Sequence, residues 1–186
     1  AGQAQKGMSL LEGREGQPIA ASCVTVMDDP FYKDSMVAIP FDAEGTATYT
    51  KAVSREGVLE TRLYNHKTAD KAGVNTTGNA SKAGYAGTIE TSPYTFYVKS
   101  GEKSLSEMMK DVEQGVYVTS VTGLHAGTNA ITGDFSIQCG GFMIRNGVKA
   151  ESVTSFTISG NFFDMLKQVK EIGSDLQFQL PSGFTM

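Results

Sequence analysis

Only a few side chains in this sequence have the chemistry of metal ligands. His66 and His125 are the two histidines, and Cys23 and Cys139 are the two cysteines. A metal site built from His66, His125 and Cys139 would require the fold to bring them together, because no H-E-x-x-H pattern places two ligands on one helix face. We therefore predict no metal ligand. We expect His66 to begin a short helix and His125 to hydrogen-bond within its own loop.

Nucleophilic and acid–base chemistry also lacks a defined constellation. Cys139 and His125 could form a nucleophile pair, but Cys139 lies on an expected strand with no helix N-terminus or cation nearby to activate it. Both cysteines occupy apolar stretches and are predicted to be reduced, buried thiols. Asp28 and Asp29 could act as paired carboxylates, yet Asp-Asp-Pro is typical of a turn at a strand end. Asp134 follows a glycine and is interpreted as a turn residue. We predict no catalytic residue.

Composition excludes several classes of ligand. The net charge of −4 disfavours contact with phosphate backbones, so we expect no nucleic-acid partner. The glycines of the 123–134 segment lack the G-K-[ST] continuation of a phosphate loop. No apolar run approaches the roughly 20 residues that cross a bilayer, so no membrane association is expected.

Strand patterns dominate the chain. β-branched or alternating apolar residues predict strands at 19–27, 46–53, 58–64, 94–98, 116–121, 135–139, 142–145, 148–153, 156–158 and 175–180. The link 54–57 ends in glycine and favours a hairpin. Asn146-Gly147 is the strongest hairpin signal, because both residues tolerate the positive φ of a type I′ turn.

Three segments have helical patterns. His66 to Ala72 could form two turns ended by Gly73. Ser104 and Glu107 match a capping box, which predicts a helix from Leu105 to Gln114. Asn161 can cap a helix from Phe162 to Ile172, whose apolar residues recur at three- and four-residue spacing. The expected fold class is α+β, with a mainly antiparallel, strongly curled, barrel-like β-sheet and two or three short helices.

The expected organisation is a flexible leading segment followed by one domain. Residues 1–16 are polar and glycine-rich, whereas residues 17–186 carry the strand and helix patterns, and the start resembles the middle of a longer protein. Two long Gly-rich loops, 74–87 and 123–134, are of the kind that often carries function.

Nine short phrases, taken in order, resemble the C-terminal domain of one protein family. They are Met27-Asp28-Asp29-Pro30, Phe41-Asp42-Ala43-Glu44-Gly45, Gly57-Val58-Leu59-Glu60, Thr77-Gly78-Asn79-Ala80, Gly115-Val116-Tyr117-Val118-Thr119, Thr132-Gly133-Asp134-Phe135-Ser136, Gly141-Phe142-Met143-Ile144-Arg145-Asn146-Gly147, Ile158-Ser159-Gly160-Asn161 and Ile172-Gly173-Ser174-Asp175-Leu176. Their order and spacing, over about residues 19 to 180, are similar to the TldD/PmbA metalloprotease family, also called modulators of DNA gyrase. The phrases around Gly133 and Gly141 look more like its TldE/PmbA subunit type.

The resemblance implies a cytoplasmic, zinc-dependent peptidase complex that acts on unfolded or short peptides. In that family zinc sits on TldD-like subunits, with two histidines from the N-terminal half and a cysteine from a Gly-rich tail. The tail of this chain, 179–186, contains no cysteine, so no metal ligand is carried over and zinc is expected only on a TldD-like partner.

The expected role is therefore a non-catalytic subunit domain that holds peptide and assembles with a TldD-like subunit or with itself. Gly-rich loops allow close backbone approach, which points to six peptide-contact residues: Gly78, Asn79, Gly123, His125, Asn129 and Asp134. Two alternatives remain open. The full-length protein could be a catalytic metallopeptidase, or the chain could be a structural β-rich module unrelated to proteolysis.

Overall fold

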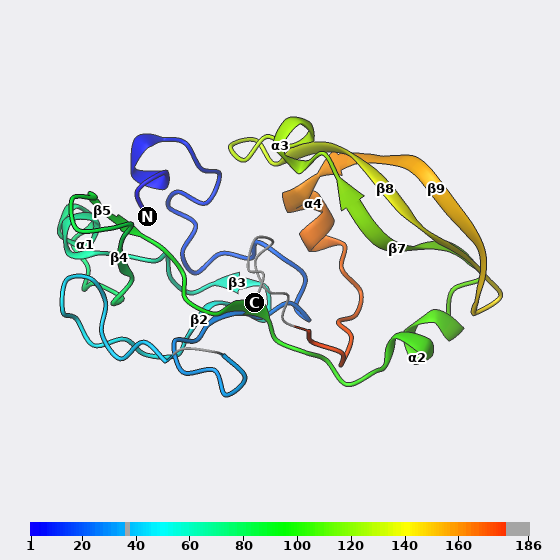
Figure 1. Cartoon of the computed structure of the whole chain (residues 1–186), viewed down its shortest axis with the longest axis horizontal. Helices are drawn as coiled ribbons and strands as arrows, with labels where there is room; N and C mark the ends of the chain where they lie inside the picture. Colours follow the sequence, from blue (N-terminus) through cyan, green and yellow to red (C-terminus); the bar gives the residue numbers. More distant parts are fainter. Residues whose placement is uncertain (36–37, 178–186) are drawn as a thin grey trace.

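The computed structural model describes residues 1–35 and 38–177. The strands are β1 (Val26–Asp28), β2 (Lys51–Arg55), β3 (Val58–Leu59), β4 (Ala80–Lys82), β5 (Ile89–Thr91), β6 (Phe96–Val98), β7 (Gln114–Thr122), β8 (Asp134–Arg145) and β9 (Val148–Asn161). The helices are the 3₁₀ helix η1 (Ala4–Lys6) and the α-helices α1 (His66–Ala72), α2 (Leu105–Lys110), α3 (Leu124–Gly127) and α4 (Phe162–Lys167). In Figure 1, β1–β5 and α1 occupy one half of the molecule and β7–β9 the other.

The first half is built on an antiparallel four-stranded sheet with the order β3-β2-β1-β6. The predicted hairpin at 54–57 is confirmed. β2 and β3 are joined by Glu56 and Gly57, both with positive φ, at 49° and 79°. A separate hairpin, β4–β5, lies in the same half of the molecule as α1 (Figure 1).

The predicted strand at 19–27 is wrong over most of its length, because only Val26–Asp28 pairs. Upstream, the backbone turns: Val24 N–H donates to the Ala21 carbonyl, and Ala21 N–H donates to the carbonyl of Leu166 in α4. The β-branched composition indicated burial correctly at Val24, which is 2% exposed. Burial there comes from tertiary contact rather than from a sheet ladder.

The helices begin where their capping residues predict. Asn65 caps α1, and Gly73 ends it in the left-handed conformation. Ser104 and Glu107 form the predicted capping box of α2, and the Asn161 side chain caps α4. Two helices end early: α2 at Lys110 and α4 at Lys167.

Tertiary bonds explain the early end of α4. The Leu166 carbonyl accepts from Ala21 N–H, and the Val169 carbonyl accepts from the Cys23 thiol at 3.5 Å. The chain then leaves the helix although its apolar spacing continues. Cys23 is exposed, so its predicted burial is wrong, whereas Cys139 is buried as predicted.

The second half is an antiparallel three-stranded meander, β7-β8-β9. The predicted Asn146-Gly147 hairpin is confirmed, with φ of 50° and 80° at the two residues. The expected break at Gly140-Gly141 is wrong, because β8 runs through both glycines with a register shift. A Cβ on Gly141 would lie 2.0 Å from the Tyr117 carbonyl oxygen, so glycine permits a close strand approach here rather than ending the strand.

The α+β class with antiparallel sheets is confirmed, but the barrel-like sheet is wrong. Among the described residues the strands divide into three separate sheets, none of them closed or strongly curled. In the meander, β7 and β9 both pair with the central β8 and do not pair with each other, so both edges stay open. Closure would require the first and last strands to pair. Residues 175–177 form no strand, and the rest of the predicted strand at 175–180 lies outside the described residues.

Buried apolar side chains are concentrated in the first half. Seven of the nine lie there, and only Cys139 and Ile144 lie in the meander. The leading segment packs on this half: Gln5 Nε2 donates to the Thr68 carbonyl at 2.6 Å, and Gly16 N–H donates to the Leu59 carbonyl at 2.8 Å. Its expected flexibility stays a prediction. In the described part of the chain no helix has the length and apolarity to span a bilayer.

Candidate functional site

A buried charge cluster holds the first half of the molecule together. Asp28, at the end of β1, is 0% exposed and accepts three hydrogen bonds. Tyr94 N–H donates to one carboxylate oxygen at 2.7 Å, Asn79 Nδ2 donates to the other at 2.7 Å, and Lys51 Nζ lies 3.3 Å from that second oxygen. Burial lowers the pKa of Lys51, while the adjacent Asp28 opposes that shift. Asp28 is therefore engaged on both carboxylate oxygens and has no exposed surface.

Gly78 and Asn79, two of the predicted peptide-contact residues, belong to this cluster. Asn79 is 0% exposed; its Nδ2 also donates to the Ser92 carbonyl at 3.1 Å, and its Oδ1 accepts from Thr77 at 2.8 Å. Gly78 is buried and its carbonyl accepts from the Tyr94 hydroxyl at 2.8 Å. Burial, followed by Asp42 and Asp28, raises the pKa of Tyr94 to about 12. Their peptide contact stays a prediction, but within this chain both residues tie the 74–87 loop to the sheet.

The other four predicted residues lie together around the loop between β7 and β8. Gly123 adopts a positive φ of 78° and begins α3, which carries the exposed His125. The contacts of the described residues include no hydrogen bond from the His125 ring. The imidazole therefore projects from a one-turn helix rather than bonding within the loop as expected.

Asn129 and Asp134 give this loop a fixed shape. The Asn129 side-chain oxygen accepts from the Ile131 and Thr132 N–H groups at 2.9 and 3.2 Å. Asp134 accepts from the Thr132 hydroxyl at 2.7 Å and from Asn161 Nδ2 at 2.9 Å, and these bonds lower the pKa of its carboxyl group. The loop is exposed yet ordered by its own side chains.

Asn161 is the site residue that the sequence reasoning missed. Its Oδ1 caps α4 by accepting from Phe163 N–H at 3.0 Å, as predicted. Its Nδ2 also donates to the Thr132 carbonyl at 2.8 Å and to Asp134. One amide therefore fixes the β7–β8 loop to the end of β9. Only the capping role had a sequence signal.

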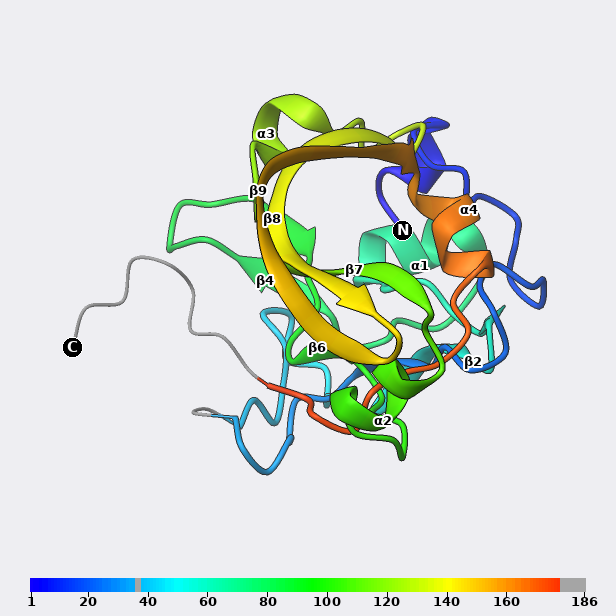
Figure 2. The same ribbon diagram turned by 90° about the vertical axis from the view of Figure 1, so that its right-hand side faces the viewer.

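Two long strand edges lie beside this loop. β7 and β9 are each hydrogen-bonded on one side, by β8. Large apolar side chains on this sheet and on the α3 and α4 turns are 41 to 62% exposed: Val116, Val121, Leu124, Val148, Phe162 and Met165. Figure 1 shows the meander on the side of the molecule opposite to β2–β5, and Figure 2 shows α3 at its upper end and α2 at its lower end. An uncovered sheet with half-exposed valines is typical of a contact surface.

The candidate metal ligands named from the sequence do not converge in the described part of the chain. In residues 1–35 and 38–177, no group of three or more His, Cys, Asp or Glu side chains comes together as metal ligands would. Figure 1 shows α1, which begins at His66, and α3, which carries His125, in different halves of the molecule. Cys139 is buried in β8, 3% exposed. The structure therefore does not assemble His66, His125 and Cys139.

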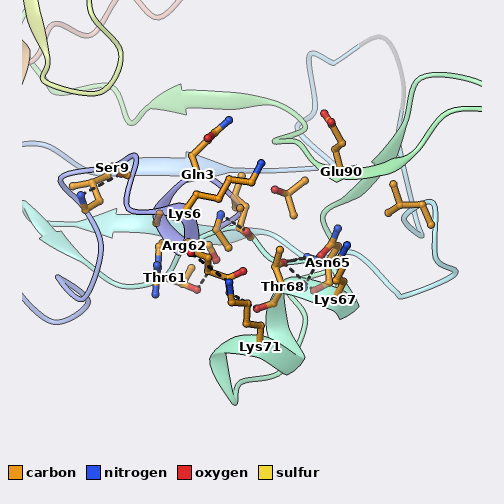
Figure 3. A pocket seen from close by; sticks show the side chains of 18 of the residues that line it. Gln3, Lys6, Ser9, Thr61, Arg62, Asn65, Lys67, Thr68, Lys71 and Glu90 are labelled. Carbon is orange, nitrogen blue, oxygen red and sulfur yellow. Dashed lines mark hydrogen bonds between the residues drawn. The ribbon is translucent and has the colours of Figure 1, made fainter.

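A separate pocket of about 680 Å³ lies between the leading segment, α1 and β5 (Figure 3). Its apolar lining includes Leu11, Leu63 and Ile89, and its polar lining includes Asn65 and Thr68. Four basic side chains and a single carboxylate complete the lining: Lys6, Arg62, Lys67, Lys71 and Glu90. No sequence pattern indicated this pocket, because its walls come from segments that are separated along the chain: residues 1–11, 53–71 and 88–91.

Fold and loops together define the class of protein: an α+β domain that offers an ordered loop and open strand edges. A family model described as the PmbA/TldA metallopeptidase C-terminal domain matches residues 1–186. The chain belongs to this family, which confirms the resemblance that the nine phrases carry.

Relatives and solved structures agree with this assignment. A metalloprotease of Methanothermobacter thermautotrophicus is 36% identical over 96% of this chain and 38% of its own length. Metalloprotease PmbA of Escherichia coli O157:H7 is 30% identical over 93% of this chain and 36% of its own length. The crystal structure of TldE from Thermococcus kodakarensis superposes with a TM-score of 0.87 at 26% identity, covering 97% of this chain and 40% of that one. This chain thus spans less than two fifths of the length of these curated relatives.

Proposed function

We propose that this chain is the C-terminal domain of a TldE-like, non-catalytic subunit of a zinc-dependent peptidase complex. In this proposal it assembles with a TldD-like subunit in the cytoplasm, and zinc and its ligands are on the partner. The domain contributes an ordered loop and strand edges that hold unfolded or short peptides in an extended conformation. Main-chain hydrogen bonds to a strand edge need no particular side chain, which suits a peptidase of broad preference.

The observation that carries this proposal is the uncovered β7–β9 meander. Its core contains two buried apolar residues, its β7 and β9 edges are open, and valines such as Val121 and Val148 are 45% and 62% exposed. A sheet so poorly covered gains stability when another surface packs on it. The likeness to TldE supports placing that surface in a family complex.

Peptide contact is proposed for the part of the loop that is accessible. Gly123, His125, Asn129 and Asp134 are exposed and lie beside the end of β9. The Asp134 carboxylate and the His125 ring present an acceptor and a donor at the loop surface.

The test is reconstitution with a TldD-like subunit. Mixing should give a complex on size-exclusion chromatography that cleaves an unstructured peptide, with cleavage lost when zinc is chelated. Val121→Lys places a charge on the uncovered sheet and should weaken the complex, whereas Lys170→Gln on the exposed chain after α4 should not. Failure of the two proteins to associate at micromolar concentration contradicts the proposal.

A catalytic metallopeptidase is the second candidate, because relatives that share this domain are described as metalloproteases and are longer than this chain. Here the full-length protein would form its own metal site from segments beyond this sequence. An H-E-x-x-x-H pattern encoded upstream of Ala1, together with zinc-dependent cleavage by the full-length protein alone, would establish this alternative.

A further inference from the structure

The pocket between the leading segment, α1 and β5 has a charge opposite to that of the chain. The whole sequence carries a formal net charge of −4, yet the pocket lining has four basic side chains and a single carboxylate. Figure 3 shows Lys6 and Arg62 on one side, Lys67 and Lys71 on α1, and Glu90 across the pocket. A concave surface with one dominant sign of charge concentrates ligands of the opposite sign.

Two of the basic groups are already engaged, and two are available. Arg62 Nε forms an ion pair with Glu15, and Lys71 Nζ donates to the Gln5 carbonyl at 3.4 Å. Lys6 and Lys67 are exposed, and neither forms an ion pair with any residue in the described part of the chain. These two ammonium groups can therefore bind a carboxylate without breaking an existing pair.

The walls that carry Lys6 and Lys67 are held relative to each other. Gln5 Nε2, beside Lys6 on η1, donates to the carbonyl of Thr68, beside Lys67 on α1, at 2.6 Å. The Asn65 side chain accepts from Thr68 N–H at 2.9 Å and fixes the start of α1. The backbone segments that carry the two lysines are thus held at a fixed separation before a ligand arrives, although the exposed lysine side chains themselves are free to move.

Apolar side chains also line the pocket, among polar and charged ones. Leu11, Leu63 and Ile89 face the pocket, and Ile89 is 41% exposed. A volume of about 680 Å³ lies within the usual range for ligand sites. A ligand that matches both features has carboxylates next to branched apolar groups.

We propose that this pocket binds a peptide segment in which acidic side chains alternate with leucine-like side chains. The carboxylates lie against Lys6 and Lys67, and the apolar side chains contact Leu63 and Ile89. This inference rests on the pocket alone and not on the proposed peptide contact at the β7–β8 loop. Its failure leaves the subunit proposal standing, and the reverse also holds.

The test is fluorescence anisotropy with the 186-residue chain and three labelled peptides. The first alternates leucine and glutamate and has an amidated C-terminus; the second replaces each glutamate by glutamine; the third is the glutamine peptide with a free C-terminal carboxylate. We expect the glutamate peptide to bind most tightly. Its affinity should fall as the salt concentration is raised, because salt screens exposed charges. Equal binding of the first two peptides, binding of the third alone, or no binding of any overturns the proposal.

Variants locate the binding. Lys6→Gln and Lys67→Gln should each lower the affinity for the glutamate peptide about two- to five-fold, and Glu90→Gln should raise that affinity. Each change alters one exposed charge beside the peptide carboxylates. Lys170→Gln, which removes an exposed lysine outside the pocket, is the matched control and should leave binding unchanged. Circular dichroism verifies that each variant is folded. If Lys170→Gln lowers the affinity for the glutamate peptide as much as Lys67→Gln does, the peptide does not bind in this pocket.

Discussion

Asp28 shows how one residue type can indicate two different roles. In the sequence, Asp28-Asp29-Pro30 is a turn signal or a pair of carboxylates; in the structure only Asp29 is partly exposed, and Asp28 is fully buried against Lys51. Asp29 accepts from Phe31 N–H at 3.0 Å and from Thr50 at 2.6 Å, as a turn residue does. The two neighbouring carboxylates thus differ in burial and in hydrogen-bonding partners, although both lie near enough to Lys51 to favour its charged form.

Replacing Asp28 should destabilise the chain more than replacing its neighbour. Asp28→Asn leaves the Lys51 ammonium buried without its counter-charge, and we expect a loss of about 3–5 kcal/mol in the free energy of unfolding. Asp29→Asn keeps most of its hydrogen bonding and should cost about 1 kcal/mol. Urea denaturation at neutral pH measures both. Equal losses for the two variants would show that the buried ion pair does not stabilise this sheet.

Tyr94 should make stability depend on alkaline pH. Its pKa is about 12 in the fold against 10.0 unperturbed, so the unfolded chain releases this proton first, and the stability that Tyr94 contributes falls as pH rises from 10 towards 12. Lys51, whose pKa is lowered from 10.5, acts in the opposite direction as pH approaches 10.5, because its unfolded state then binds more protons.

Comparison of Tyr94→Phe with the native chain isolates the tyrosine, since Lys51 is present in both. At neutral pH the variant should be less stable by about 1 kcal/mol, because the bond to the Gly78 carbonyl is lost. That difference should shrink between pH 10 and 12, measured by urea denaturation at each pH. Tyr85→Phe, at a fully exposed tyrosine, serves as control. If the difference in the free energy of unfolding between Tyr94→Phe and the native chain stays constant with pH, the pKa of Tyr94 is not raised in the fold.

At the scale of elements, two glycines with the same backbone angle should respond differently to substitution. Gly57, in the β2–β3 turn, has φ of 79°, and a Cβ there would lie 2.3 Å from the Ala20 carbonyl oxygen; Gly45 has φ of 78° and open space around it. Gly45→Ala should cost about 1–2 kcal/mol from backbone strain alone. Gly57→Ala should lose about 1–3 kcal/mol more, because the methyl group collides with backbone.

Thermal unfolding of these two glycine variants checks this expectation. If Gly57→Ala and Gly45→Ala lower the melting temperature equally, the close approach of the 20–21 backbone to this turn is not present in solution.

Asn161 links two elements, and two substitutions can separate its roles. Asn161→Ala removes the cap of α4 and both bonds to the β7–β8 loop, and should cost about 1–2 kcal/mol. Asn161→Asp keeps an acceptor for the cap but removes the donor and places a second carboxylate beside Asp134. Hydrogen exchange should show loss of protection in the 129–134 loop for both variants and in α4 only for the alanine variant. If protection of the 129–134 loop is unchanged in Asn161→Asp, the Asn161 amide does not hold this loop to the end of β9.

At the scale of the whole molecule, the two halves are joined by few contacts. Ala21 N–H donates to the Leu166 carbonyl at 2.9 Å and the Cys23 thiol to the Val169 carbonyl at 3.5 Å, and the connecting segments are joined by Gly101 N–H to the Gly173 carbonyl at 2.9 Å and by the exposed Lys103–Glu171 ion pair. No strand of one sheet pairs with a strand of another in the described residues. Most buried apolar side chains lie in the first half. The meander is therefore expected to open more readily than the β3-β2-β1-β6 sheet.

Native-state hydrogen exchange should resolve this difference. Amides of β7–β9 should exchange at lower denaturant concentration than those of β1 and β2. Gly57→Ala should reduce this difference in denaturant concentration, because it destabilises the first half alone. Addition of a TldD-like subunit should slow exchange in the meander. Simultaneous exchange of both halves under all conditions would indicate one cooperative unit and count against an independently stabilised contact surface.

Residue types and their spacing were enough to predict several local features of this protein. The caps at Ser104 and Asn161, the αL end at Gly73 and the Asn146-Gly147 hairpin depend on residues within a few positions of each other, so their types and spacing predict them. Nine phrases in order also sufficed to identify the family, because each preserves a local requirement.

Only the tertiary structure decided which strands share a sheet, where Asp28 and Asn79 are buried, and which segments form the basic pocket. β8 continues through Gly140-Gly141 where the Tyr117 backbone lies against it. α4 ends early where Ala21 binds the Leu166 carbonyl and Cys23 binds the Val169 carbonyl just beyond the helix. The predicted barrel is wrong because the strands divide into three sheets. The sequence could not show this, since pairing between distant strands has no local sequence signature. Packing of the whole chain selects which distant segments form hydrogen bonds with each other. The local sequence of either segment does not show which partner it will pair with.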